Sequence, residues 1–130
     1  MFHKLLNNIG AEILIKGLDA LWMRQRVISN NIANATTPGY KSKSVEFENV
    51  LKSVLNRDNI DKGTLERAAS KLNPELVERD WISDSEDGNN VVLDKENIEL
   101  ARAQLQYSAL VTALNAQISR LRYAITGGHQ

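Results

Sequence analysis

Two stretches near the ends of this 130-residue chain repeat apolar residues at alternating steps of three and four, forming two seams. The first seam contains Ala11, Leu14, Leu18, Leu21, Gln25, Ile28, Ile32 and Ala35. The second contains Leu100, Ala103, Tyr107, Leu110, Leu114, Gln117, Leu121 and Ala124. This spacing predicts a mainly α protein with two long terminal helices packed as a coiled-coil-like pair. The alternative is that each stretch is an ordinary core helix of a small bundle.

The first helix is expected to end just before a turn at residues 37–40. Thr37 precedes a proline and is therefore pushed away from the helical conformation. Pro38 followed by Gly39 suits a type II turn, in which Gly39 takes a positive φ. We therefore expect the helix to stop near residues 34–36.

Three asparagines, Asn30, Asn31 and Asn34, crowd the last turns of this helix. Asparagine is a poor helix former because its side chain competes for backbone hydrogen bonds. We expect the three residues to fix the helix end and its contacts. The alternative is a frayed, asparagine-rich helix end with no specific role.

The middle of the chain is expected to be a short irregular segment. Residues 41–56 suggest a short helix or an ordered arm that packs on the first helix. Residues 57–80 carry five basic and six acidic residues and few apolar ones, so we interpret them as a linker. Residues 83–90 form a cluster of turn-forming residues before the second helix.

The second long helix is expected to begin with Asp94 as its N-cap and to end at Gly127 and Gly128. We therefore expect a single domain, residues 1–130. It divides into an N-terminal helix (1–36), a turn, arm and linker (37–93) and a C-terminal helix (94–127).

Composition and motifs argue against several classes of function. Sixteen basic and 16 acidic residues give zero net charge, which argues against nucleic-acid binding. There is no cysteine, and His3 and His129 lie at opposite ends, so we expect no metal site, cofactor or catalytic residue. No phosphate loop or nucleophile motif is present, and we expect neither enzyme activity nor a small-molecule substrate. No apolar run reaches the ~20 residues of a membrane span, and the first ten residues lack the pattern of a cleaved signal peptide.

The stretch from Ser29 to Tyr40 also resembles the N-terminal signature of bacterial flagellar basal-body rod, hook and hook-associated proteins. The matching residues are Asn30, Asn31, Ile32, Ala33, Asn34, Thr37, Pro38, Gly39 and Tyr40. A second similarity, over residues 87–96 and 121–127, is to the proximal rod members of this family. Val92 departs from that pattern, because an acidic residue is usual there. Together the resemblance covers roughly residues 10–51 and 87–127.

The resemblance implies a structural subunit of the proximal rod, which assembles with copies of itself and other rod proteins into a drive shaft that transmits torque. It implies export by the flagellar type III apparatus without a cleaved signal peptide. It also implies assembly in the periplasm on the membrane ring and its adaptor protein. The signature residues are then an assembly motif, and the large apolar seam residues pack the helices. The alternative is a helical adaptor or regulator that oligomerises through its terminal helices.

Overall fold

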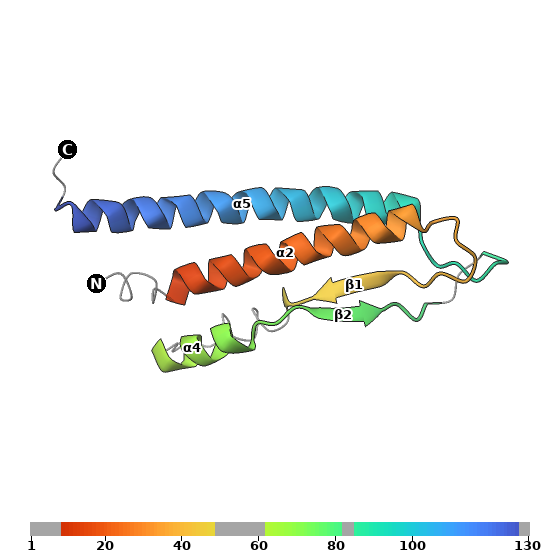
Figure 1. Ribbon diagram of the computed structural model, residues 1–130, viewed down its shortest axis with the longest axis horizontal. Helices are drawn as coiled ribbons and strands as arrows, with labels where there is room; N and C mark the ends of the chain where they lie inside the picture. Colours follow the sequence, from red (N-terminus) through yellow and green to blue (C-terminus); the bar gives the residue numbers. More distant parts are fainter. Residues whose placement is uncertain (1–8, 49–61, 82–84, 128–130) are drawn as a thin grey trace.

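The computed structural model describes residues 9–48, 62–81 and 85–127. The elements, in chain order, are α2 (Ile9–Ala33), β1 (Lys43–Glu46), α4 (Lys62–Lys71), β2 (Glu75–Glu78) and α5 (Leu93–Ile125). They form layers in an elongated molecule: α5 lies on one side of α2, and the two strands and α4 lie on the other (Figure 1). Helix α2 is therefore the central element of the fold.

The two long helices pack against each other along their length and run in opposite directions (Figure 1). Leu21, Ile28 and Ala103 are almost completely buried, and the remaining seam residues are half-buried, except for the exposed Ala124 near the end of α5. Each helix therefore turns its seam toward the interior. The prediction of a mainly α fold with two packed terminal helices is confirmed.

The helix ends differ from the expected ones by a few residues. Helix α2 ends at Ala33, because the chain enters the turn immediately afterwards. Asp94 is not the N-cap of α5: the cap is Val92, in an extended conformation with φ −109° and ψ 102° and no side-chain capping bond. Asp94 instead lies in the first turn, where its carboxylate still suits the helix dipole. Gly127 follows the C-cap Thr126 with a positive φ of 64° and ends the helix.

The interpretation of residues 57–80 as a linker is wrong for the part that the structure describes. Strands β1 and β2 form an antiparallel pair in which Lys43 faces Glu78 and Val45 faces Leu76. Helix α4 packs on α2, where Lys16 Nζ donates a hydrogen bond to the Ala69 carbonyl. Apolar residues are sparse here, but Ala69 and Leu72 are buried, whereas Leu76 is 47% exposed.

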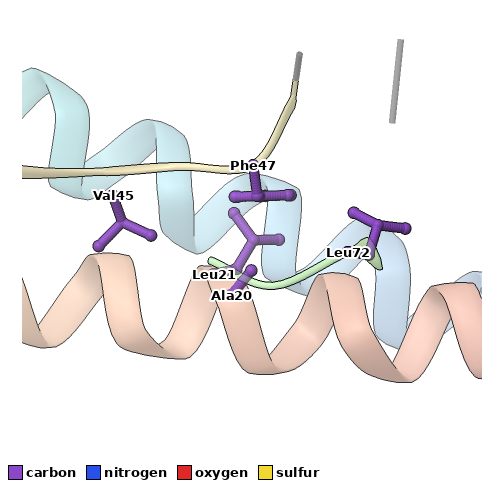
Figure 2. Close-up of a cluster of buried hydrophobic side chains, with 5 residues drawn as sticks. All are labelled: Ala20, Leu21, Val45, Phe47 and Leu72. Carbon is purple, nitrogen blue, oxygen red and sulfur yellow. The ribbon is translucent and has the colours of Figure 1, made fainter. Parts of the chain in front are cut away.

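A small apolar core joins these elements. It consists of Ala20, Leu21, Val45, Phe47 and Leu72, which α2, β1 and the segments after β1 and α4 bring together (Figure 2). Residues 41–48 thus form an arm that packs on the first helix, as a strand instead of a helix. The other apolar residues of the expected arm, Val50, Leu51 and Leu55, lie outside the described residues.

Arg24 holds β1 on α2. Its Nη2 donates a 2.6 Å hydrogen bond to the Val45 carbonyl and a 2.8 Å bond to the Glu48 carboxylate. Its guanidinium also lies 4.7 Å from the centre of the Phe47 ring. The hydrogen bond from Arg24 lowers the pKa of Glu48. Among the helices described, none combines the length and apolar character required to cross a membrane.

Candidate assembly motif

The signature residues form the end of α2 and the turn that follows it. The Asn34 amide still bonds the Asn30 and Asn31 carbonyls. The turn then closes with a 3.2 Å hydrogen bond from the Tyr40 amide to the Thr37 carbonyl. Gly39 has φ 71°, so the prediction of a positive φ there is confirmed. With Pro38 before it, this is the geometry of a type II turn.

Asn31 is the centre of a buried polar network. It is completely buried, and its Nδ2 donates to the Lys43 carbonyl at 2.8 Å and to Glu96 Oε2 at 2.9 Å. Its Oδ1 accepts hydrogen bonds from the Lys43 amide at 3.0 Å and from the Tyr40 hydroxyl at 3.1 Å. The side-chain amide thus uses both donors and both acceptor sites. One residue of α2 thereby holds the turn, β1 and α5 together.

Glu96 extends the network to α5 and to the segment that follows β2. Only 1% of Glu96 is exposed, and its second oxygen accepts a hydrogen bond from Arg79 Nη1, which makes a buried ion pair. The Arg79 guanidinium stacks 4.9 Å from the centre of the Trp81 ring. The buried carboxylate is therefore neutralised by one cation and hydrogen-bonded by one amide. A buried charge needs both kinds of partner.

Two asparagines of the loop before α5 close the network from the other side. Asn89 Nδ2 donates to the Asn34 carbonyl at 2.9 Å and to the Thr37 carbonyl at 2.8 Å. Both carbonyls lie just after the end of α2 and also accept backbone hydrogen bonds, from the Thr37 and Tyr40 amides. Asn90 accepts a 2.6 Å bond from the Ser42 amide and donates a 2.8 Å bond to the Arg79 carbonyl. The loop thus holds the turn after α2 in place from a distance in sequence.

Tyr40 and Asp87 both have shifted pKa values. Burial raises the pKa of the Tyr40 hydroxyl, and the nearby carboxylates of Glu96 and Glu78 raise it further. The Ser85 hydroxyl and the Asn89 amide donate hydrogen bonds to Asp87 and lower the pKa of its carboxyl. The raised pKa keeps the Tyr40 hydroxyl protonated, so that it can donate a hydrogen bond. The lowered pKa keeps the Asp87 carboxylate ionised, so that it can accept hydrogen bonds.

The signature divides into a buried and an exposed half. Asn31 is buried, and Ile32, Asn34 and Tyr40 are half-buried. The exposed half consists of Asn30, Ala33, Thr37, Pro38 and Gly39. Asn31, Asn34 and Tyr40 make hydrogen bonds within the chain, so the exposed half is the part of the motif most open to another molecule.

Sequence reasoning missed the partners of Asn31. Nothing in the sequence pattern pairs Asn31 with Glu96, and Arg79 falls within residues 57–80, which the sequence suggests are a linker. One signal was present: Glu96 lies four residues before Leu100, so it continues the spacing of the second seam. A charged residue at a seam position indicates burial with a partner. The partner Arg79 carries no comparable signal.

The hydrogen bonds of this region hold its segments together. Within residues 9–48, 62–81 and 85–127, no three His, Cys, Asp or Glu residues gather as a metal site would require. The polar groups of the network bond one another, and the Ser42 Oγ is buried without a hydrogen-bond partner.

Known flagellar rod proteins are similar to this chain over most of its length. A sequence profile described as "Flagella basal body rod protein" matches residues 12–41, which include the whole signature. The flagellar basal body rod protein FlgB of Bacillus subtilis is 39% identical over 109 residues, covering 82% of this chain and 84% of that protein. FlgB of Escherichia coli K12 is 34% identical over 117 residues, covering 82% and 85%. FlgB of Salmonella typhimurium is 31% identical over the same length, with the same coverage.

Proposed function

Because the chain belongs to the FlgB family of flagellar basal body rod proteins, it is a structural subunit of the flagellar rod, and we propose that it forms part of the proximal rod. There it would assemble with copies of itself and with other rod proteins. We further propose that the type III export apparatus delivers it to the periplasm, and that the membrane ring and its adaptor protein support the base of the rod. Family membership supports each of these proposals.

The observation that carries the mechanical part of the proposal is the packing of α2 on α5. The two helices are 25 and 33 residues long and contact each other along their length. The Asn31–Glu96 hydrogen bond joins them at one end, and the Arg79–Glu96 ion pair joins α5 to the segment after β2. A helix pair that is packed along a seam and fixed at one end resists sliding and twisting. These are the loads that a rotating shaft places on its subunits.

We assign two roles to the assembly motif. Its buried half, centred on Asn31, gives the end of α2 its shape. Its exposed half, which includes Asn30 and Pro38, is the part that we propose contacts neighbouring subunits. The whole chain, residues 1–130, then acts as one axial domain with helices at both ends.

The proposal is tested by genetic replacement. In a strain that lacks the native gene, an epitope-tagged copy is expected to restore swimming and to copurify with isolated basal bodies. The control is the same strain with an empty vector, which should contain the membrane ring but no completed rod. Complete rods without the chain, or a complementing chain absent from the basal bodies, would contradict the proposal.

A further inference from the structure

A cleft with a volume of about 770 Å³ lies between β1 and α5. Two buried apolar residues line it, Ile28 of α2 and Val45 of β1. Trp81 and Ile98 also line it but remain 43% and 59% exposed, so much of their apolar surface is open. None of the described lining residues belongs to the assembly motif, so the cleft is a separate surface. Proteins commonly bind ligands in concave, partly apolar sites of this size.

Most charged side chains of the cleft are already paired. Three ion pairs account for them: Arg24–Glu48, Arg79–Glu96 and Arg102–Glu99. Among the described residues, neither Lys95 nor Glu46 has an ion-pair partner, although both line the cleft. Lys95 Nζ lies 5.4 Å from the centre of the Trp81 ring, so its charge sits beside the exposed aromatic surface. The cleft therefore offers one free positive charge and one free negative charge.

The two free charges lie at different levels along the cleft. A hydrogen bond from Asn31 to the residue after Lys95 sets the level of Lys95. A hydrogen bond from Arg24 to the residue before Glu46 sets the level of Glu46. Asn31 and Arg24 are seven residues apart in α2, which corresponds to a rise of ~10 Å. A ligand that neutralises both charges must therefore carry its own charges about 10 Å apart.

The cleft is too narrow for a helix. Along α5 its lining extends from Lys95 to Gln106, eleven residues further on, which corresponds to ~16 Å. A volume of 770 Å³ spread over that length gives a mean width of ~8 Å. A helix with its side chains is ~10–12 Å across. An extended chain fits this width better.

We propose that this cleft binds an extended segment of another protein, in which an acidic residue and a basic residue flank two or three apolar residues. The acidic residue pairs with Lys95, the apolar residues cover Trp81 and Ile98, and the basic residue pairs with Glu46. Three residues of extended chain span ~10 Å, which matches the separation of the two levels. The site goes beyond the proposed function, because it is a contact away from the assembly motif.

The described extended segments of the chain itself do not suit the cleft. Strand β1 is already one of its walls, since Ser44, Val45 and Glu46 line it. Strand β2 has acidic residues at both ends, Glu75 and Glu78, so it lacks a basic residue to pair with a second copy's Glu46. The charge pattern therefore favours a different protein as the source of the segment.

The binding can be tested with a fluorescein-labelled synthetic peptide, Gly-Asp-Leu-Val-Leu-Lys-Gly, and the purified full chain. Fluorescence anisotropy should show saturable binding as the chain is titrated up to ~1 mM. Lys95→Glu should weaken binding by about tenfold, because it replaces an attraction with a repulsion. A second peptide, with lysine in place of aspartate, should bind Lys95→Glu more tightly than it binds the native chain. This exchange of affinities would not follow from a damaged fold.

Two further variants control for non-specific effects. Lys71→Glu makes the same charge change at an exposed residue of α4 outside the cleft and should leave the affinity unchanged. In Trp22→Phe, Trp81 is the only tryptophan left, and its emission should shift when the peptide binds. Thermal midpoints should be the same for Lys95→Glu and Lys71→Glu as for the native chain.

Three results would overturn the proposal. The first is the absence of binding at ~1 mM chain. The second is equal affinity of the first peptide for the native chain and Lys95→Glu. The third is a dimer of the native chain that Lys95→Glu dissociates, which would mean that a second copy fills the cleft. None of these results bears on whether the tagged chain is found in basal bodies, so the proposed function is tested separately.

Discussion

Asn31 and Ser42 are both completely buried, but their side chains differ in what they bond. Asn31→Ala would leave the Lys43 amide and carbonyl without their partners and remove a donor from Glu96. Since an unsatisfied buried group costs ~1–3 kcal/mol, we expect the free energy of unfolding to fall by about 3 kcal/mol. Urea unfolding of the purified chain measures this.

Ser42→Ala is the matched control for Asn31→Ala. The Ser42 Oγ has no hydrogen-bond partner, so its removal breaks no bond. We expect a change of less than about 1 kcal/mol. If the free energy of unfolding fell equally in the two variants, the hydrogen bonds of Asn31 would contribute no more to stability than the unbonded Ser42 hydroxyl.

Gly39 tests the cost of backbone conformation alone. Its φ is 71°, and a Cβ added there would meet no atom within 4 Å, so crowding plays no part. Gly39→Val should therefore lower the free energy of unfolding by about 1–2 kcal/mol, the cost of the left-handed conformation for a side chain. Gly39→Asn should cost less, because asparagine tolerates this region. Thermal melts of the three proteins should rank Gly, Asn, Val.

Tyr40 makes the stability of the fold sensitive to high pH. Its pKa is raised in the folded chain, mainly by burial, so folding favours the neutral hydroxyl. The stability that this contributes is complete below the unfolded pKa of about 10 and is lost as the pH rises through the folded pKa. Above pH ~10 the native chain should therefore lose stability faster than Tyr40→Phe. If the thermal midpoints of the native chain and Tyr40→Phe changed with pH in the same way, this prediction would be wrong.

At the scale of elements, α5 must be continuous to pack on α2. Leu114 is half-buried in the middle of its seam. Leu114→Pro should cost about 3 kcal/mol or more, because it removes a helical hydrogen bond and kinks the helix. The control is Leu93→Pro at the first helical position, where Val92 before it is already extended and the ring is tolerated. Circular dichroism should show lost helicity and stability for Leu114→Pro only.

The seams and the turn could be predicted because their signals are local. Spacing at threes and fours specifies a helix face, and Pro38 with Gly39 specifies a type II turn, without knowledge of any distant residue. These signals were sufficient for α2, α5 and the positive φ of Gly39.

The strands and the network could not be predicted because their partners are distant. Strands β1 and β2 have four residues each, too few to establish a period, and β2 pairs with β1, which packs on α2. The N-cap at Val92 makes no side-chain bond, so nothing in its residue type marks it. Arg79 resembles any surface arginine until Glu96 is placed beside it.

At the scale of the whole molecule, α2 depends on the last element of the chain. Its seam is covered by α5, and Asn31 bonds Glu96 across 65 residues of sequence. A chain ending at Val92 lacks both contacts. We expect it to show little helicity and no cooperative thermal transition, because short helices without tertiary contacts are marginal in water. Full cooperativity in this truncated chain would show that α2, the strands and α4 are sufficient alone.

The dependence of α2 on α5 also fixes the order in which the contacts of the fold can form. In a chain that enters a narrow channel with its N-terminus first, α2 emerges long before α5. Until residue 96 arrives, Asn31 lacks a partner for one of its hydrogen bonds, and the seam of α2 has nothing to cover it. Contacts between residues that are distant in sequence form only after the long segment between them is available to close as a loop. A chain exported in this way, as we propose, would therefore stay open during passage and close only when nearly all of it had reached the far side.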